Sequence, residues 1–390
     1  MKNKLKFDIK WISWYARAWV ISLNGVQIET PVFMPVGTRA TLKGIDLWLL
    51  NDSRYMEHQS NIILSNTFHL HLRPGADTIE KHWWLHNFMN WDKLILTDSW
   101  GFQVFSLWLS KNNDDNFKSN KKLVRLHEDY VEFRSPLDWS KHVFTPMGTV
   151  DTQRKFGSDI MMMLDVCSPA WDISKRKVYN QMQLTHKRAK IQSDYFDHIY
   201  AQSRWVLFPI VQWGLHNDLR EESVNYLKQF AKDGIAIWWL SVWESKEDMY
   251  RILDFLSEKL PIDIPRYLMW VGSPEEMIYA IRSGIDMFDC VLPTRLGRHG
   301  VAMKLGGNMK IKNSKYKNNL EKWLAPWCNC HACKNFTLSY LHHLIIEKEM
   351  LWGILLSLHN INYLHMLAKQ ERDHILADKQ IHRHKSNNVE

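Results

Sequence analysis

Eight short apolar segments that alternate with longer amphipathic stretches are the strongest constraint on how this chain folds. Apolar runs bounded by turn residues indicate buried strands, and their alternation with helical patterns is typical of βα units around a parallel sheet. Eight parallel strands predict an α/β protein with a (β/α)8 TIM barrel. The predicted strands are 31–37, 61–66, 94–99, 159–167, 206–212, 235–242, 266–272 and 285–293. The helices predicted between them include 175–200, 217–232, 246–259 and 274–283.

A doubly wound parallel sheet is the alternative arrangement of the same elements. No G-x-G-x-x-G follows a predicted strand, so the sequence offers no dinucleotide-binding turn in support of that alternative. No apolar run approaches 18 residues, and the N-terminus has no secretory signal, which predicts a cytoplasmic protein without a membrane span. The net charge of +8 favours a polyanionic partner, nucleic acid above all.

Three of the five cysteines lie in "CNCHAC" at residues 328–333. This spacing is too close for the disulfide framework of a secreted protein and suits a metal site. Cys328, Cys330 and Cys333 with one histidine would complete a closed tetrahedral set, which is typical of structural Zn²⁺. The fourth ligand is open from spacing alone, because four histidines compete for it: His331, His342, His343 and His359.

These patterns predict three parts of the chain. Residues 1–293 form the barrel, with an N-terminal β segment and an inserted region at 105–147 whose second half has the pattern of a hairpin. Residues 294–370 form a zinc-binding subdomain with helices, and residues 371–390 form a C-terminal tail.

Polar residues stand where four predicted strands end: Asp98, Asp165, Gln212 and Asp289. The carboxyl ends of barrel strands face the active site, so these side chains are expected to share one pocket. Two carboxyl groups in one pocket can divide their work, one as nucleophile and one as general acid/base. Each could instead be a helix cap or a hydrogen-bonded loop acid.

Basic residues follow the strand that carries Asp289, in "PTRLGRHG" at 293–300. Arg295, Arg298 and His299 could hold phosphates there, or could lie in a solvated loop. The basic run continues at 310–317, where Tyr316 is expected to offer a stacking face.

Six motifs, in this order, resemble bacterial-type tRNA-guanine transglycosylase: "ETPVFMPVGT", "SNTFHLHLRPG", "LTDSWGFQVFSL", "GIDMFDCVLPTR", "CNCHAC" and "LHHL…LHNINY". The resemblance covers about residues 5–370. It implies a zinc-containing TIM barrel that acts as a homodimer on the anticodon loop of tRNA. Such an enzyme replaces the wobble guanine with 7-aminomethyl-7-deazaguanine, a step of queuosine biosynthesis.

The resemblance also assigns roles to the strand-end acids. Asp289 would attack ribose C1′ and form a covalent tRNA–enzyme intermediate, and Asp98 would be the general acid/base. Arg295 and Arg298 would contact the anticodon loop, and His359 would be the fourth zinc ligand.

For the base pocket, the resemblance implies a further set of contacts. Asp165 and Gln212 would bind the edge of the base, and Phe102 would stack on it. Cys167 and Val242 would lie near the 7-substituent. The remaining pocket residues would be Trp239, Leu240 and Met269.

Tryptophan occurs where the resembled family has glycine. The chain has 20 Trp and 16 Gly, whereas glycine usually makes up about 7% of residues. Indoles beside Asp98 and Asp165 would leave little room for a base, and "LDWS" at 137–140 stands where a hairpin turn favours Asp-Gly. We therefore expect glycine at most of these positions in the native protein, encoded by UGA codons read as glycine. The family-glycine positions are Trp100, Trp213, Trp238, Trp239, Trp243, Trp270 and Trp352.

Two other functions remain open from the sequence. If the tryptophans are real, the chain could be a non-catalytic tRNA-binding zinc protein of the same fold, although the presence of Asp98 and Asp289 argues against this. The same enzyme could also use queuine as its base.

Overall fold

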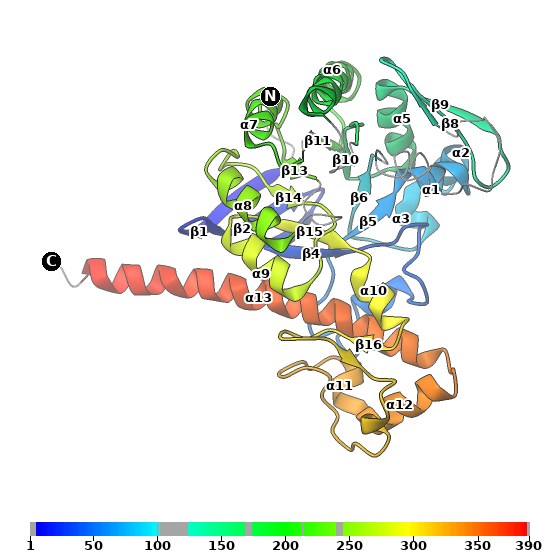
Figure 1. Cartoon of the computed structure of the whole chain (residues 1–390), viewed down its shortest axis with the longest axis vertical. Helices are drawn as coiled ribbons and strands as arrows, with labels where there is room; N and C mark the ends of the chain where they lie inside the picture. Colours follow the sequence, from blue (N-terminus) through cyan, green and yellow to red (C-terminus); the bar gives the residue numbers. More distant parts are fainter. Residues whose placement is uncertain are drawn as a thin grey trace.

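The computed structural model describes residues 5–99, 101, 124–167, 174–212, 214–238 and 245–387, with side chains to residue 378. Its centre consists of parallel strands in two hydrogen-bonded sheets, which helices surround in Figure 1. The strands are β4 (Val32–Pro35), β5 (Ile62–Asn66), β6 (Leu94–Asp98), β10 (Ile160–Met162), β11 (Val206–Phe208), β12 (Ile210–Val211), β13 (Ile235–Ile237), β14 (Arg266–Leu268) and β15 (Met287–Cys290).

Two connections close these strands into a barrel. β11 and β12 are two pieces of one strand, because Pro209 between them has no N–H for the ladder. β11 pairs with β10 and β12 pairs with β13, so this strand links the two hydrogen-bonded sheets. On the other side, a parallel bridge joins Val36 to Leu64 and so connects β4 to β5. The predicted eight-stranded barrel is confirmed, with β11 and β12 counted together.

The barrel interior is filled by apolar side chains from alternate strand positions, such as Met34, Leu96, Met162 and Met287. Helices cover the outside, and several begin at residues whose side chains cap the first turn. Ser245 and Ser273, for example, accept hydrogen bonds from the backbone N–H groups of Asp248 and Glu276. The outer helices are α5 (Pro146–Phe156), α6 (Lys175–Tyr200), α7 (Asn217–Leu227), α8 (Lys246–Ser257) and α9 (Pro274–Arg282).

Smaller elements extend the barrel. An antiparallel sheet of β1 (Lys6–Ser13), β2 (Ala16–Leu23) and β3 (Val26–Thr30) precedes it. β7 (Val124–Leu126), β8 (Val131–Arg134) and β9 (Lys141–Phe144) form another antiparallel sheet, which confirms the predicted hairpin. Short helices follow β5 and lead toward β6: α1 (Thr67–Leu72), α2 (Ala76–Lys81) and α3 (Trp84–Phe88).

The C-terminal part packs beside the barrel (Figure 1). It consists of α10 (Leu292–Gly297), β16 (Val301–Ala302), β17 (Met309–Lys310), α11 (His331–Asn335), α12 (Leu338–Ile346) and α13 (Leu351–Asn387). α13 packs against α10 and β4, and Glu371 on this helix forms an ion pair with Arg282 of α9. The boundary predicted at residue 370 therefore falls inside one continuous helix, and residues 371–387 continue α13 instead of forming a separate tail.

None of the helices in the described ranges has the length and apolar character needed to cross a bilayer.

Tryptophan is over-represented at left-handed backbone positions. Ten non-glycine residues in the described part of the chain have positive φ, and six of them are tryptophan. This conformation costs an L-residue about 1–2 kcal/mol and is the ordinary place for glycine. Burial does not compensate for that cost at Trp14 or Trp83, which are 94% and 74% exposed. The six are Trp14, Trp83, Trp84, Trp139, Trp270 and Trp327, with φ between 56° and 78°.

We predict that Trp14→Gly raises the free energy of unfolding by up to about 1 kcal/mol. The change releases left-handed strain of about 1–2 kcal/mol, offset by about 0.5–1 kcal/mol of added backbone entropy in the unfolded chain. Trp323→Gly is the matched control, because Trp323 is also exposed but is not among the described residues with positive φ. The control should lose stability. Urea unfolding measures both, and equal effects of the two changes would contradict the left-handed explanation.

Candidate active site

The four predicted strand-end residues lie at one end of the barrel. Asp98 ends β6, Asp289 lies in β15, Gln212 directly follows β12, and Asp165 lies three residues beyond β10. All four are buried, with at most 5% of each residue exposed. The carboxylates of Asp289 and Asp165 both raise the pKa of Asp98, so the three acids share one electrostatic environment. The structure thus brings these residues together as the sequence predicted.

Asp98 is arranged to carry a proton. Asn66, at the end of the neighbouring strand β5, donates from Nδ2 to Oδ2 of Asp98 at 2.6 Å, and the backbone N–H of Thr67 donates to Oδ1 at 3.3 Å. Burial raises the pKa of Asp98 to about 8, and the nearby carboxylates of Asp289 and Asp165 add to this shift. Asp98 is therefore mostly protonated at pH 7 and can act as an acid.

Asp289 differs from Asp98 in its hydrogen bonds and its charge. Tyr267 Oη donates to Oδ1 of Asp289 at 2.6 Å, and the backbone N–H of Trp270 donates to the same oxygen at 2.9 Å. Burial raises the pKa of Asp289 to about 6, and the two hydrogen bonds oppose that rise. Asp289 is therefore mostly ionised at pH 7, as a nucleophile must be.

Asp165 and Gln212 form a polar wall beside these two acids. Gln212 Nε2 donates to Oδ2 of Asp165, and Ser99 Oγ donates to Oδ1 at 3.2 Å. Burial raises the pKa of Asp165 to about 6. A Cβ atom at Gly101 would lie 2.2 Å from Oδ1 of Asp165, so only glycine allows this close approach. The wall presents carboxylate and amide groups that can bind donors and acceptors on a planar ligand.

Indole rings crowd the same end of the barrel. Trp238 and Trp270 contact each other edge to face, with ring centroids 4.7 Å apart. The predicted pocket residue Met269 is buried. It directly follows β14 and precedes Trp270 in the chain. Four other predicted pocket residues lie outside the described residues: Phe102, Trp239, Leu240 and Val242.

Basic residues border this end. Arg295 and Arg298 lie at the end of α10, which begins two residues after Cys290, the last residue of β15. Arg295 is exposed, and Arg298 is half-buried. Burial and the neighbouring Arg295 lower the pKa of Arg298. The expected stacking role of Tyr316 is wrong, because this ring is only 7% exposed and packs in the core.

Cys328, Cys330, Cys333 and His359 form a buried cluster whose ligand atoms all lie within 4.8 Å of one another. The three Sγ atoms lie 3.5, 3.6 and 3.4 Å, respectively, from Nδ1 of His359. Zn–S and Zn–N bonds of about 2.3 and 2.0 Å at a tetrahedral angle give a separation of about 3.5 Å, so the donor set fits zinc. The other ring nitrogen of His359 lies 3.2 Å from the Met303 carbonyl oxygen, which orients the imidazole as a metal ligand requires.

The other three competing histidines are not part of this cluster. The Nδ1 atom of His342 lies 2.9 Å from the Ile311 carbonyl oxygen, His331 contacts Asn335, and His343 is exposed. His359 is thus the histidine that the structure places with the three cysteines.

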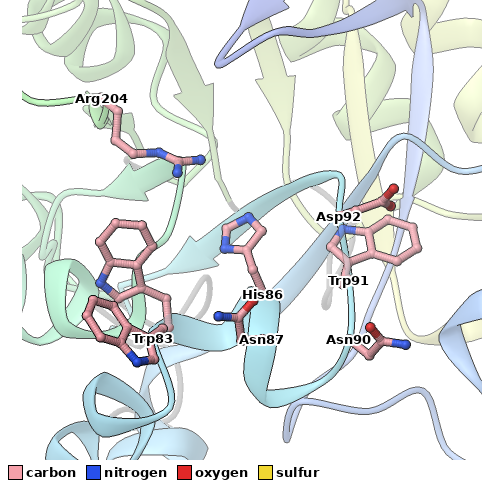
Figure 2. Close-up of a pocket in the computed structure, with 8 residues that line it drawn as sticks. Trp83, His86, Asn87, Asn90, Trp91, Asp92 and Arg204 are labelled. Atoms are coloured by element: carbon pink, nitrogen blue, oxygen red, sulfur yellow. The ribbon is translucent and has the colours of Figure 1, made fainter.

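A cavity of about 460 Å³ lies at the opposite end of the barrel (Figure 2). Asp92 and Arg204, which line it, each precede a barrel strand, so the cavity lies at the amino ends of the strands. His86 and Arg204 both contact buried Asp159, at 3.0 and 2.6 Å. This end of a TIM barrel usually serves stability, and we do not assign the cavity a catalytic role.

Sequence reasoning missed two residues of the site. Asn66 is a polar residue at a strand end, so the signal that found Asp98 could have found it. Tyr267 gave no such signal, because it lies inside an apolar strand and resembles a core residue.

Comparisons with known proteins identify the family. The sequence profile of the family described as queuine tRNA-ribosyltransferase matches residues 13–386. The chain is 43% identical over 373 residues to a queuine tRNA-ribosyltransferase of Acinetobacter baylyi, covering 96% of this chain and 91% of that protein. It is also 43% identical over 368 residues to one of Francisella tularensis subsp. novicida, covering 94% of each. The chain belongs to the queuine tRNA-ribosyltransferase family of enzymes.

Proposed function

We propose that this protein exchanges the wobble guanine of a tRNA anticodon for 7-aminomethyl-7-deazaguanine in queuosine biosynthesis, through a covalent intermediate on Asp289. The observation that carries the proposal is the pair of buried carboxyl groups, Asp98 and Asp289, at the ends of two barrel strands, each held by its own hydrogen-bond donors. The pKa of Asp98 is about 8 and that of Asp289 about 6. The family of the chain and the names of its relatives support a tRNA substrate.

The reaction uses these two carboxyl groups. The Asp289 carboxylate attacks ribose C1′, the C1′–N9 bond breaks, and guanine leaves with the bonding electron pair. Asp98 gives its proton to the departing base. The Asp98 carboxylate then takes a proton from the incoming base, whose nitrogen attacks C1′ and releases Asp289. Each residue returns to its starting state.

Base recognition is assigned to the polar wall. Asp165 and Gln212 bind the edge of the flipped base, with Met269 and the backbone of Trp239 and Leu240 beside it. Cys167 and Val242 lie near the 7-substituent, and Phe102 stacks on the base. Arg295 and Arg298 hold phosphates of the anticodon loop. Queuine is the alternative base.

Zinc is proposed as the occupant of the Cys₃His cluster. With four protein ligands it leaves no position for water, so its contribution is to hold the C-terminal part in shape. A homodimer and a cytoplasmic location, where tRNA is found, also remain predictions.

We predict that Asp289→Asn abolishes incorporation of radiolabelled guanine into tRNA, and that no covalent tRNA–protein species can be trapped in denaturing gels. An amide cannot supply the attacking oxygen anion. Asp263→Asn removes an exposed carboxylate and serves as the control that should keep full activity. Trapped intermediate in the Asp289 variant would contradict the proposed nucleophile.

The proposed zinc site is tested by measuring how many zinc atoms are bound per chain. His359→Ala should lower bound zinc from one atom per chain toward none and lower the melting temperature, because a buried ligand is lost. His343→Ala is the control, since His343 is exposed and outside the cluster. Elemental analysis of the purified proteins gives the result, and full zinc occupancy in the His359 variant would refute its role as ligand.

A non-catalytic tRNA-binding protein is the second candidate, and the indoles of Trp238 and Trp270 favour it for the chain as written. We propose that glycine stands at these positions in the native protein. The left-handed backbone of Trp270, with φ of 64°, supports glycine there.

The two candidates predict different outcomes for glycine replacement. The chain as written should exchange little or no guanine. Simultaneous Trp→Gly replacement at 100, 213, 238, 239, 243 and 270 should restore exchange, because among other changes it removes the Trp238 and Trp270 indoles from the barrel end that carries the acids. Trp91→Gly should not help, since Trp91 is buried and its Nε1 donates to the Leu94 carbonyl oxygen. UGG codons at positions 238 and 270 of the gene would refute the glycine assignment.

A further inference from the structure

The register of two barrel strands places Tyr267 beneath Asp289. Tyr267 in β14 pairs with Met287 in β15, and Asp289 lies two residues further along that strand. Residues two apart in a strand point to the same face, and a diagonal neighbour is within reach of an aromatic side chain. Tyr267 and Met287 both belong to the core inside the barrel. The Tyr267 ring therefore lies in the barrel interior, and its hydroxyl meets Asp289 at the barrel end.

The Tyr267 hydroxyl is a permanent donor. Tyr267 is fully buried, and its Oη lies 2.6 Å from Oδ1 of Asp289. Burial and the charge of Asp289 raise the pKa of Tyr267 well above its usual value. The phenol consequently keeps its proton at neutral pH, and it donates to the ionised Asp289 carboxylate.

The hydrogen bonds to Asp289 are unevenly shared between its two oxygens. Oδ1 accepts both from Tyr267 and from the backbone N–H of Trp270. Within the described part of the chain, no hydrogen bond to Oδ2 of Asp289 is found. Asp98 shows the opposite pattern, with one donor on each oxygen.

We propose that Tyr267 is a positioning residue that fixes Oδ1 of Asp289 and thereby makes Oδ2 the attacking oxygen. The inference rests on the proposed function of Asp289. Oδ2 forms the bond to C1′ as the C1′–N9 bond breaks, and the electron pair leaves with guanine. Oδ1 becomes the carbonyl oxygen of the resulting ester and keeps both donors. When the incoming base attacks C1′, the C1′–Oδ2 bond breaks and its electron pair returns to the Asp289 carboxylate.

Two consequences follow for the reaction. Among the described residues both donors lie on Oδ1, which leaves the lone pairs of Oδ2 for the attack on C1′. The hydrogen bonds also stabilise the ionised form of Asp289 and so extend its activity to lower pH. A purely structural tyrosine in the barrel core would have neither effect.

The test is Tyr267→Phe, assayed in whichever parent exchanges guanine, the chain as written or the glycine-restored chain. Loss of a charge-assisted hydrogen bond should lower kcat by about 10- to 100-fold. The acidic limb of the pH–rate profile should move up by roughly one pH unit, because Asp289 becomes easier to protonate. KM for tRNA should not change. Tyr279→Phe is the matched control, because Tyr279 donates to Asp254 at the surface at 2.8 Å.

The outcomes separate this inference from the proposed function. Absence of exchange in both parents contradicts the proposed function. Exchange in a parent, with an unchanged acidic limb and kcat in folded Tyr267→Phe, overturns the inference about Tyr267. If the phenylalanine variant does not fold, 3-fluorotyrosine at position 267 replaces it, since a more acidic phenol is a stronger donor. The acidic limb should then move to lower pH, and an unmoved limb would again overturn the inference.

Discussion

Hydrogen bonds between neighbouring parallel strands fix the positions of Asp98 and Asp289 at the proposed site. Asn66 stands directly beside Asp98 because β5 and β6 pair in that register. Tyr267 reaches Asp289 because β14 and β15 pair with Tyr267 opposite Met287. A slip of one residue would turn these side chains to the opposite face of the sheet. The proposed chemistry therefore requires the correct register between the barrel strands, because that register decides which side chains face the site.

Burial then gives the acids different properties. All three carboxyl groups are removed from water, which raises each pKa, but their partners differ. Asp289 keeps two donors on one oxygen and stays mostly ionised at pH 7. Asp98 experiences the negative charges of both neighbours and stays mostly protonated. The two like groups thus acquire different pKa values, because burial, hydrogen bonds and neighbouring charges act on them to different extents.

The sequence predicted the features that have a local pattern. Apolar runs indicated all eight strands, and polar residues at their ends indicated Asp98, Asp165, Gln212 and Asp289. Cysteine spacing indicated a metal site but left its histidine open, because His359 is brought in by α13 from a distance in the chain. Tyr267 could not be predicted, since its hydroxyl acquires a role only through the pairing of β14 with β15. Tyr316 was misassigned because a basic neighbourhood does not reveal which way a ring packs.

Trp270 connects the unusual composition to the proposed chemistry. Its backbone N–H donates to Oδ1 of Asp289, and its φ of 64° lies in the left-handed region. Glycine adopts that conformation without strain and carries the same N–H. Replacing the indole by hydrogen would therefore keep the donor on Oδ1 and remove the ring that contacts Trp238. The second hydrogen bond to Asp289 depends on the backbone conformation at position 270, which favours glycine, and not on the side chain there.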